Sequence, residues 1–133
     1  MSDSKNKKLR IYIAGPYNPI EANQSISPVH DASRIAQIHV DKAIEIANAL
    51  IEKGHYVYCP HLNHFIHTHY SCKKDYLYWW YKEDITFLKH WANALFYMED
   101  SYGARKELEL AKKRKLRIFY SLEKVPIVGK NKY

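Results

Sequence analysis

The stretch at residues 101–111 contains the residue types best suited to chemistry. Gly103 lets backbone N–H groups approach a ligand closely, and the helix expected after it would point its positive end there. Ala104, Glu107 and Ala111 are three and four residues apart, so they share a helix face on which the carboxylate has small neighbours. A carboxylate near the positive end of a helix should stay ionised, which suits a nucleophile.

Glu107 also has a simpler interpretation as a surface residue. The same helix is expected to expose a charged face made of Arg105, Lys106, Glu109, Lys112 and Lys113. On this interpretation, Glu107 pairs with Lys106 or Arg114 and takes no part in chemistry.

The elements that would position these residues alternate along the chain. Short segments rich in β-branched and aromatic residues predict four strands, at residues 9–14, 55–59, 94–98 and 116–120. Apolar residues at helical spacing predict a helix that begins at Asp31 or Ser33 and ends at Gly54. Further helices are expected at residues 75–90 and 104–114. Residues 125–128 could add an edge strand, although their proline weakens that prediction.

Strands alternating with helices predict an α/β fold with a doubly wound parallel sheet of four to five strands and helices on both faces. We expect the strand order 2-1-3-4(-5) in a single domain over residues 1–133, with flexible tails at 1–8 and 124–133. Ligands of such sheets bind beyond the carboxyl ends of the strands. The segments there are rich in polar residues, Gly and Pro, at residues 15–17, 60–63 and 99–103.

Four motifs occur in order along the chain. They are Tyr12-Ile13-Ala14-Gly15-Pro16-Tyr17, then Pro60-His61-Leu62-Asn63, then Asp84, then Ser101-x-Gly103-x-x-x-Glu107-Leu108-x-x-Ala111. This pattern resembles the nucleoside 2-deoxyribosyltransferase family and its relatives that hydrolyse nucleoside 5′-monophosphates, over about residues 9–120. The resemblance implies a flavodoxin-like fold and a dimer or larger homo-oligomer.

The resemblance also implies roles for individual residues. Glu107 matches the nucleophile, Asp84 matches a carboxylate that contacts the base and helps it leave, and Tyr12 matches a tyrosine that orients the nucleophile. Asp75 is the alternative to Asp84. Ser101 matches a serine that touches phosphate in the hydrolases. The expected substrate-binding residues are Gly15, Pro16, Tyr17, His61, Asn63, Ser101 and Gly103.

These residue types suit the breaking of an N-glycosidic bond. One carboxylate attacks the sugar carbon and a second acidic group assists the leaving base. We therefore expect an enzyme that hydrolyses or transfers the base of a (deoxy)nucleoside or nucleoside 5′-monophosphate. Trp79, Trp80 and Tyr81 could stack on a base, or could be core or interface residues. The alternative function is a binding module for nucleotides or nucleic acids that has the same fold but no turnover.

A third alternative, a zinc-stabilised interaction protein, comes from the histidines and cysteines of one stretch. They are Cys59, His61, His64, His67, His69 and Cys72. Imidazole and thiolate groups bind zinc, but this spacing is irregular and includes no C-x-x-C pair. We expect no metal and no cofactor.

The net charge of +7 admits two kinds of anionic partner. We read the basic surface as favouring a phosphorylated small substrate, and expect no nucleic-acid partner. The basic run at residues 112–117 could contact nucleic-acid phosphates or could simply complement its own helix dipole. The sequence has no apolar signal segment or membrane span, so a cytoplasmic protein is expected. The aromatic segment at residues 76–81 predicts at least a homodimer.

Overall fold

The computed structural model describes residues 7–16, 29–63 and 76–128, and the side chains at 7–16, 37–63 and 82–128. Four parallel strands form one sheet in the order β2-β1-β3-β4. The centre of the sheet contains β1 (Arg10–Ala14) and β3 (Ala94–Tyr97), and its edges are β2 (Tyr56–Tyr58) and β4 (Arg117–Phe119). This confirms the predicted parallel α/β fold and strand order.

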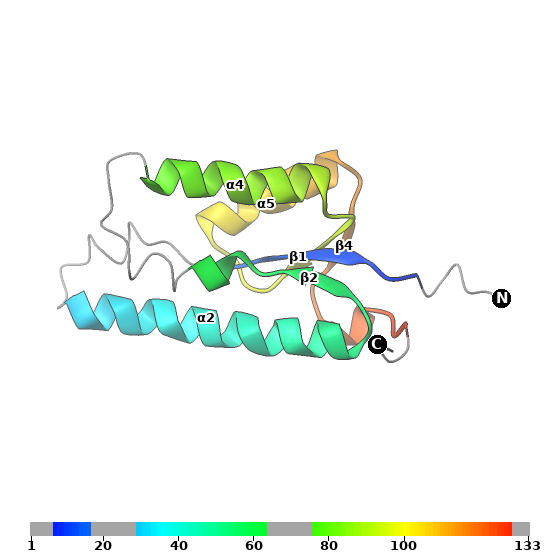
Figure 1. Ribbon diagram of the computed structural model, residues 1–133, viewed down its shortest axis with the longest axis horizontal. Coiled ribbons are helices and arrows are strands. Elements are labelled where there is room, and N and C mark those ends of the chain that lie inside the picture. The colour runs from blue at the N-terminus through cyan, green and yellow to red at the C-terminus, as the bar shows by residue number, and fades with distance from the viewer. Residues whose placement is uncertain (1–6, 17–28, 64–75, 129–133) are drawn as a thin grey trace.

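Helices cover both faces of the sheet (Figure 1). One face packs against α2 (Val29–Glu52), and the other against α4 (Tyr76–His90) and α5 (Tyr102–Lys113). Two short 3₁₀ turns, η2 (Pro60–Asn63) and η3 (Leu122–Lys124), follow β2 and β4. The first helix begins earlier than predicted, so Asp31 and Ser33 lie inside α2 rather than at its N-cap. Helix ends are set by backbone bonding, and a capping residue type alone fixes them poorly.

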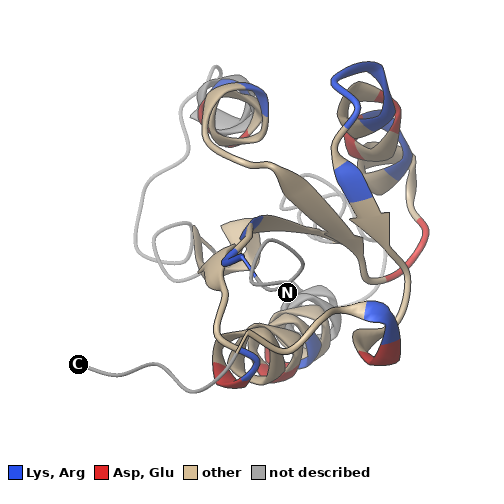
Figure 2. Cartoon of the chain, turned by 90° about the vertical axis from the view of Figure 1, so that its right-hand side faces the viewer, with Lys and Arg blue, Asp and Glu red and all other residues tan. Residues whose placement is uncertain are grey.

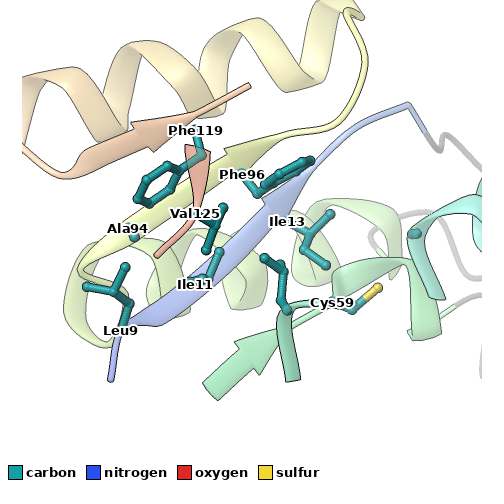
Figure 3. Close-up of a cluster of buried hydrophobic side chains, with 10 residues drawn as sticks. Leu9, Ile11, Ile13, Cys59, Ala94, Phe96, Phe119 and Val125 are labelled. Carbon is teal, nitrogen blue, oxygen red and sulfur yellow. The ribbon is translucent and has the colours of Figure 1, made fainter. Parts of the chain in front are cut away.

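Side chains of β1 alternate between the two cores. Ile11 and Ile13 point to the α2 side, where Leu9, Phe119 and Val125 join them (Figure 3). Tyr12 and Ala14 point to the opposite side, into a second cluster formed largely by α4 and α5. Because side chains of a strand alternate in direction, Tyr12 is placed on the face that carries both of these helices.

The chain after η3 packs onto the first core. Val125 is 2% exposed, and the backbone N–H of Val128 donates to the carbonyl of Lys53 at 2.8 Å. The Nδ1 atom of His55 accepts from the Leu9 N–H at 3.0 Å, so Nε2 is the atom that donates to the Pro126 carbonyl at 2.7 Å. Residues 125–128 therefore do not form the edge strand that the sequence allowed. Burial of Val125 favours a packed but irregular segment.

Within residues 7–16, 29–63 and 76–128, no helix has the length and apolar character needed to cross a membrane.

Candidate active site

Glu107 lies on the side of α5 that faces the sheet. Ala104 and Ala111, which lie one turn before and one turn after Glu107, are 1% and 0% exposed. The three residues therefore share the covered face of α5, as their spacing in the sequence predicted. Their small side chains let α5 approach the sheet, and the Glu107 carboxyl reaches the fully buried Tyr12 of β1. The Tyr12 hydroxyl donates a hydrogen bond to Oε2 of Glu107. The structure therefore favours the site interpretation of Glu107 over the surface interpretation.

Arg114, one of the two cations considered as partners of Glu107, binds elsewhere. Its Nη1 donates to the backbone carbonyl of Leu88 at 2.9 Å, which ties the end of α5 to α4. The predicted charged face of α5 is exposed, at Arg105, Lys106, Glu109, Lys112 and Lys113.

Asp84 belongs to a second tyrosine–carboxyl pair. It lies in α4, and its Oδ1 accepts a hydrogen bond from the hydroxyl of Tyr58 on β2 at 2.9 Å. The Nδ2 atom of Asn63, in η2, donates to the same oxygen at 3.3 Å. Asn63, expected from the sequence to bind substrate, therefore reaches Asp84. Both donors bind Oδ1, so Oδ2 is the oxygen on which Asp84 can carry a proton.

The two tyrosine–carboxyl pairs lie side by side. Tyr12 and Tyr58 are direct partners across β1 and β2, and their ring centroids are 5.7 Å apart with 30° between the planes. Tyr58 also stacks on Phe87 of α4, at 4.1 Å and 12°. The sheet register therefore places one carboxyl group from α5 and one from α4 over neighbouring strands.

Burial raises the pKa of both carboxyl groups. The pKa of Glu107 rises to about 8, mainly by desolvation and further by the negative charge of Asp84, while the Tyr12 hydrogen bond opposes the rise. Desolvation also raises the pKa of Asp84 to about 7; the Tyr58 hydrogen bond opposes it and the charge of Glu83 adds to it. Near neutral pH the two groups therefore hold about one proton between them.

The ionised Glu107 expected from the helix dipole is not what the free protein has. Glu107 is in the second turn of α5, whereas the dipole effect is concentrated in the first turn. Desolvation outweighs what remains of it. Burial also raises the pKa of both Tyr12 and Tyr58 above the usual value for tyrosine, so their hydroxyls stay protonated and remain donors.

Glycines expected to allow close approach of a ligand have different surroundings. A Cβ added at Gly15 would lie 2.5 Å from Cε and 3.2 Å from Cβ of Met98, so the Met98 side chain would have to shift to admit one. At Gly103 the structure has no atom within 4 Å of an added Cβ among the neighbours described. That position is exposed, and none of the described residues fills the space beside it.

Other predicted binding residues surround the end of β1 and the start of α5. Pro16 directly follows Gly15, and His61 is buried in η2, where desolvation lowers its pKa to about 4 and keeps it neutral. The Oγ atom of Ser101 accepts from the Ala104 N–H at 3.0 Å and so caps α5. Tyr17 lies outside the described residues.

Several other candidates also lie outside the described part of the chain. They are Asp75, His64, His67, His69, Cys72 and the side chains of Trp79, Trp80 and Tyr81. Cys59 is buried, which raises the pKa of its thiol to about 11, and its Sγ is 4.0 Å from Nδ1 of His61. Among the described residues, no cluster of three His, Cys, Asp or Glu side chains could hold a metal ion.

Tyr58 is the residue of this site that the sequence did not single out. It is one of many tyrosines, in a short strand, and nothing local distinguishes it from a core residue. A signal exists only once β1 and β2 are aligned, because then Tyr58 falls opposite Tyr12.

Neither the protein-family models nor the curated proteins include a match to this chain.

Proposed function

We propose that this protein cleaves or transfers the N-glycosidic bond of a (deoxy)nucleoside or nucleoside 5′-monophosphate through a covalent glycosyl-enzyme intermediate. The observation that carries the proposal is the Tyr12–Glu107 pair beside the Tyr58–Asp84 pair. Two partly buried carboxyl groups that share about one proton can supply a nucleophile and an acid at neutral pH. The resemblance to the nucleoside 2-deoxyribosyltransferase family supports the same assignment.

In the first step, Oε1 of Glu107 attacks C1′ of the sugar. The bond from C1′ to the base breaks, and the base nitrogen keeps the electron pair. Asp84 transfers its proton to the departing base and becomes a carboxylate. The sugar is then attached to Glu107 as an ester. The Tyr12 hydroxyl, bound to Oε2, holds the carboxyl in position for this attack.

In the second step, Asp84 accepts a proton from water while the water oxygen attacks C1′. The ester bond breaks, and Glu107 returns to its carboxylate form. A second base that attacks through its own nitrogen would give transfer in place of hydrolysis. Both outcomes restore the starting proton count of the pair, so the enzyme is ready for another cycle.

The reaction uses the form in which the proton is on Asp84 and Glu107 is ionised. In the free protein the pKa of Glu107, about 8, lies above that of Asp84, about 7, so the shared proton favours Glu107. The hydrogen bond that Tyr12 donates lowers the cost of moving this proton to Asp84, because it stabilises the ionised form of Glu107. On Asp84 the two donors at Oδ1 leave the proton for Oδ2, so that oxygen is the one assigned to face the base.

The sequence adds two proposals about the working form of the protein. We propose a cytoplasmic homo-oligomer, a dimer or larger. The segment at residues 76–81 contains more aromatic residues than a small monomer is expected to leave exposed to solvent. Sedimentation at micromolar concentration tests this proposal, and a monomer would contradict it.

The test of function is a panel of nucleosides and 5′-monophosphates, each incubated with and without a second free base. Released or exchanged base is separated by chromatography. We expect turnover by the wild type, and loss of several orders of magnitude in Glu107→Ala with the fold retained. Asp84→Asn should slow departure of the base, less so for bases that are better leaving groups.

The matched control is Glu109→Ala, because Glu109 is an exposed glutamate on the same helix. It should turn over like the wild type. A slow substrate analogue should leave its sugar on the peptide that contains Glu107, as a mass increase. Glu107→Ala with wild-type turnover would refute the catalytic assignment, and ligand binding without turnover would favour the binding module.

A further inference from the structure

The positive charge of the protein gathers at the end of the sheet opposite the carboxyl ends of the strands. At this end, which we call the amino edge, the strands begin and the helices end. Its cations are Lys7, Lys8, Arg10, Lys53, Lys89, Lys112, Lys113, Arg114, Lys115, Arg117 and Lys124. Its carboxylates are Glu52 and Glu123. Figure 2 looks onto this edge, where the connection from α5 to β4 is the largest run of Lys and Arg.

The rest of the described side chains have the opposite balance. Their cations are Lys42, Lys82, Arg105 and Lys106, and their carboxylates are Asp41, Glu45, Glu83, Asp84, Glu99, Asp100, Glu107 and Glu109. Ion pairs form there, between Lys42 and Glu99 at 2.8 Å and between Arg105 and Asp100 at 3.3 Å. The basic surface therefore lies away from the candidate active site, and it does not argue for a phosphorylated substrate.

Helix dipoles explain only part of the charge at the amino edge. Lys89, Lys112 and Lys113 are in the last turns of α4 and α5, where cations stabilise a helix. Arg10 and Arg117 instead begin β1 and β4. Within the fold, Nε of Arg10 donates to the Trp91 carbonyl at 2.6 Å, and Arg117 lies 5.0 Å from the centre of the Phe119 ring. Like charges gathered on one surface still destabilise the folded state, so the excess of cations as a whole is the feature that an anionic partner would explain.

Cations from three separate segments of the chain lower the pKa of one histidine at the amino edge, His55. His55 lies just before β2, and burial lowers its pKa. The positive charges of Arg117, Lys53 and Lys8 lower it further. These residues come from β4, the residue after α2 and the segment before β1, so folding brings cations of three distant segments close to one another.

An exposed aromatic ring lies within this surface. Tyr56 begins the edge strand β2, is 55% exposed and pairs with Arg10 across the sheet. The Nζ atom of Lys8 lies 5.1 Å from the centre of its ring. A ring open to solvent among cations is the arrangement that binds single-stranded nucleic acid, by base stacking and by phosphate contacts.

We propose that the amino edge binds the phosphate backbone of single-stranded nucleic acid, with Tyr56 stacking on a base. The sequence did not favour nucleic acid, because its positive charge suits a phosphorylated small substrate equally well. Folding brings many of these cations together at one end of the sheet. The helices of the described residues meet this edge end-on, so none of them presents its long side to a lipid interface or a duplex groove there. The proposal does not depend on the catalytic assignment.

Anisotropy of a fluorescein-labelled uridine 20-mer, titrated with full-length protein over a series of salt concentrations, tests this. We expect saturable binding that weakens as salt rises. The triple variant Lys112→Gln, Lys113→Gln, Lys115→Gln should bind at least tenfold more weakly at low salt and lower the slope of log K against log salt by up to about 2. Tyr56→Ala should weaken binding at least fivefold, the effect of one lost stacked base.

A second triple variant, Lys42→Gln, Lys82→Gln, Lys106→Gln, removes the same charge away from the amino edge and should bind like the wild type. Circular dichroism confirms that each variant is folded. Equal losses in the two triple variants, or no binding at low salt, would overturn the proposal. Tighter binding to a duplex, or binding to phosphatidylserine vesicles but not to the 20-mer, would also overturn it.

Discussion

Glu107→Gln should make the protein more stable above neutral pH, because burial disfavours the charged form of Glu107. The pKa of this group rises from its usual 4.5 to about 8, so the folded state holds more protons than the unfolded state between these values. Stability therefore falls as pH rises from about 4.5 to about 8. Glutamine has the same shape, can still accept the Tyr12 hydrogen bond, and has no charge to desolvate.

The size of the effect follows from the pKa. A rise from 4.5 to about 8 costs at most about 5 kcal/mol at about 1.4 kcal/mol per pH unit. Glu107 is only partly buried and titrates together with Asp84, so we expect about 2 kcal/mol at pH 8.5. For a chain of 133 residues this corresponds to a melting temperature higher by roughly 6–10 °C. The gain should shrink to about 1 kcal/mol or less at pH 5, where the buried carboxyl is protonated.

Thermal unfolding followed by circular dichroism at half-unit steps from pH 5 to pH 8.5 measures this difference. The control is Glu109→Gln, an exposed glutamate on the same helix, whose melting temperature should track the wild type across the range. A Glu107→Gln variant that is less stable than the wild type at pH 8.5 would refute the reasoning. A gain that does not grow with pH would also refute it, because no buried charge would then be removed.

Other changes test the site and its supporting helix. Tyr58→Phe keeps the ring stacked on Phe87 but removes the hydroxyl that lowers the pKa of Asp84. We expect kcat/KM to fall about tenfold. The part of the pH–rate profile that reports loss of the Asp84 proton should move to higher pH, because the pKa of Asp84 rises. The wild-type profile should be bell-shaped with its maximum between about pH 7 and pH 8, because only the form with one shared proton reacts; a flat profile would contradict this. Ser101→Ala removes the cap on the Ala104 N–H and should destabilise the protein by about 1 kcal/mol in urea unfolding, and Ser101→Asp should restore most of it.

The elements and the orientation of α5 could be predicted from the sequence. Alternation within β1 separates Ile11 and Ile13 from Tyr12, and spacing in α5 puts Glu107 on the covered face. These patterns are local, because residues two apart in a strand or three and four apart in a helix share a face in any fold. The contact between Tyr12 and Glu107, implied by the resemblance to the nucleoside 2-deoxyribosyltransferase family, is present in the structure as a hydrogen bond.

Contacts between distant segments were decided only by the tertiary structure. The role of Tyr58 depends on the register between β1 and β2, and the packing of Val125 depends on the surface that α2 leaves open. The pKa of Glu107 also differs from the sequence-based expectation of an ionised carboxylate, because desolvation is set by everything packed around a group. The amino edge has the same origin. A parallel sheet with crossover helices brings strand starts and helix ends to one side, so cations far apart in the chain gather at the same end of the sheet.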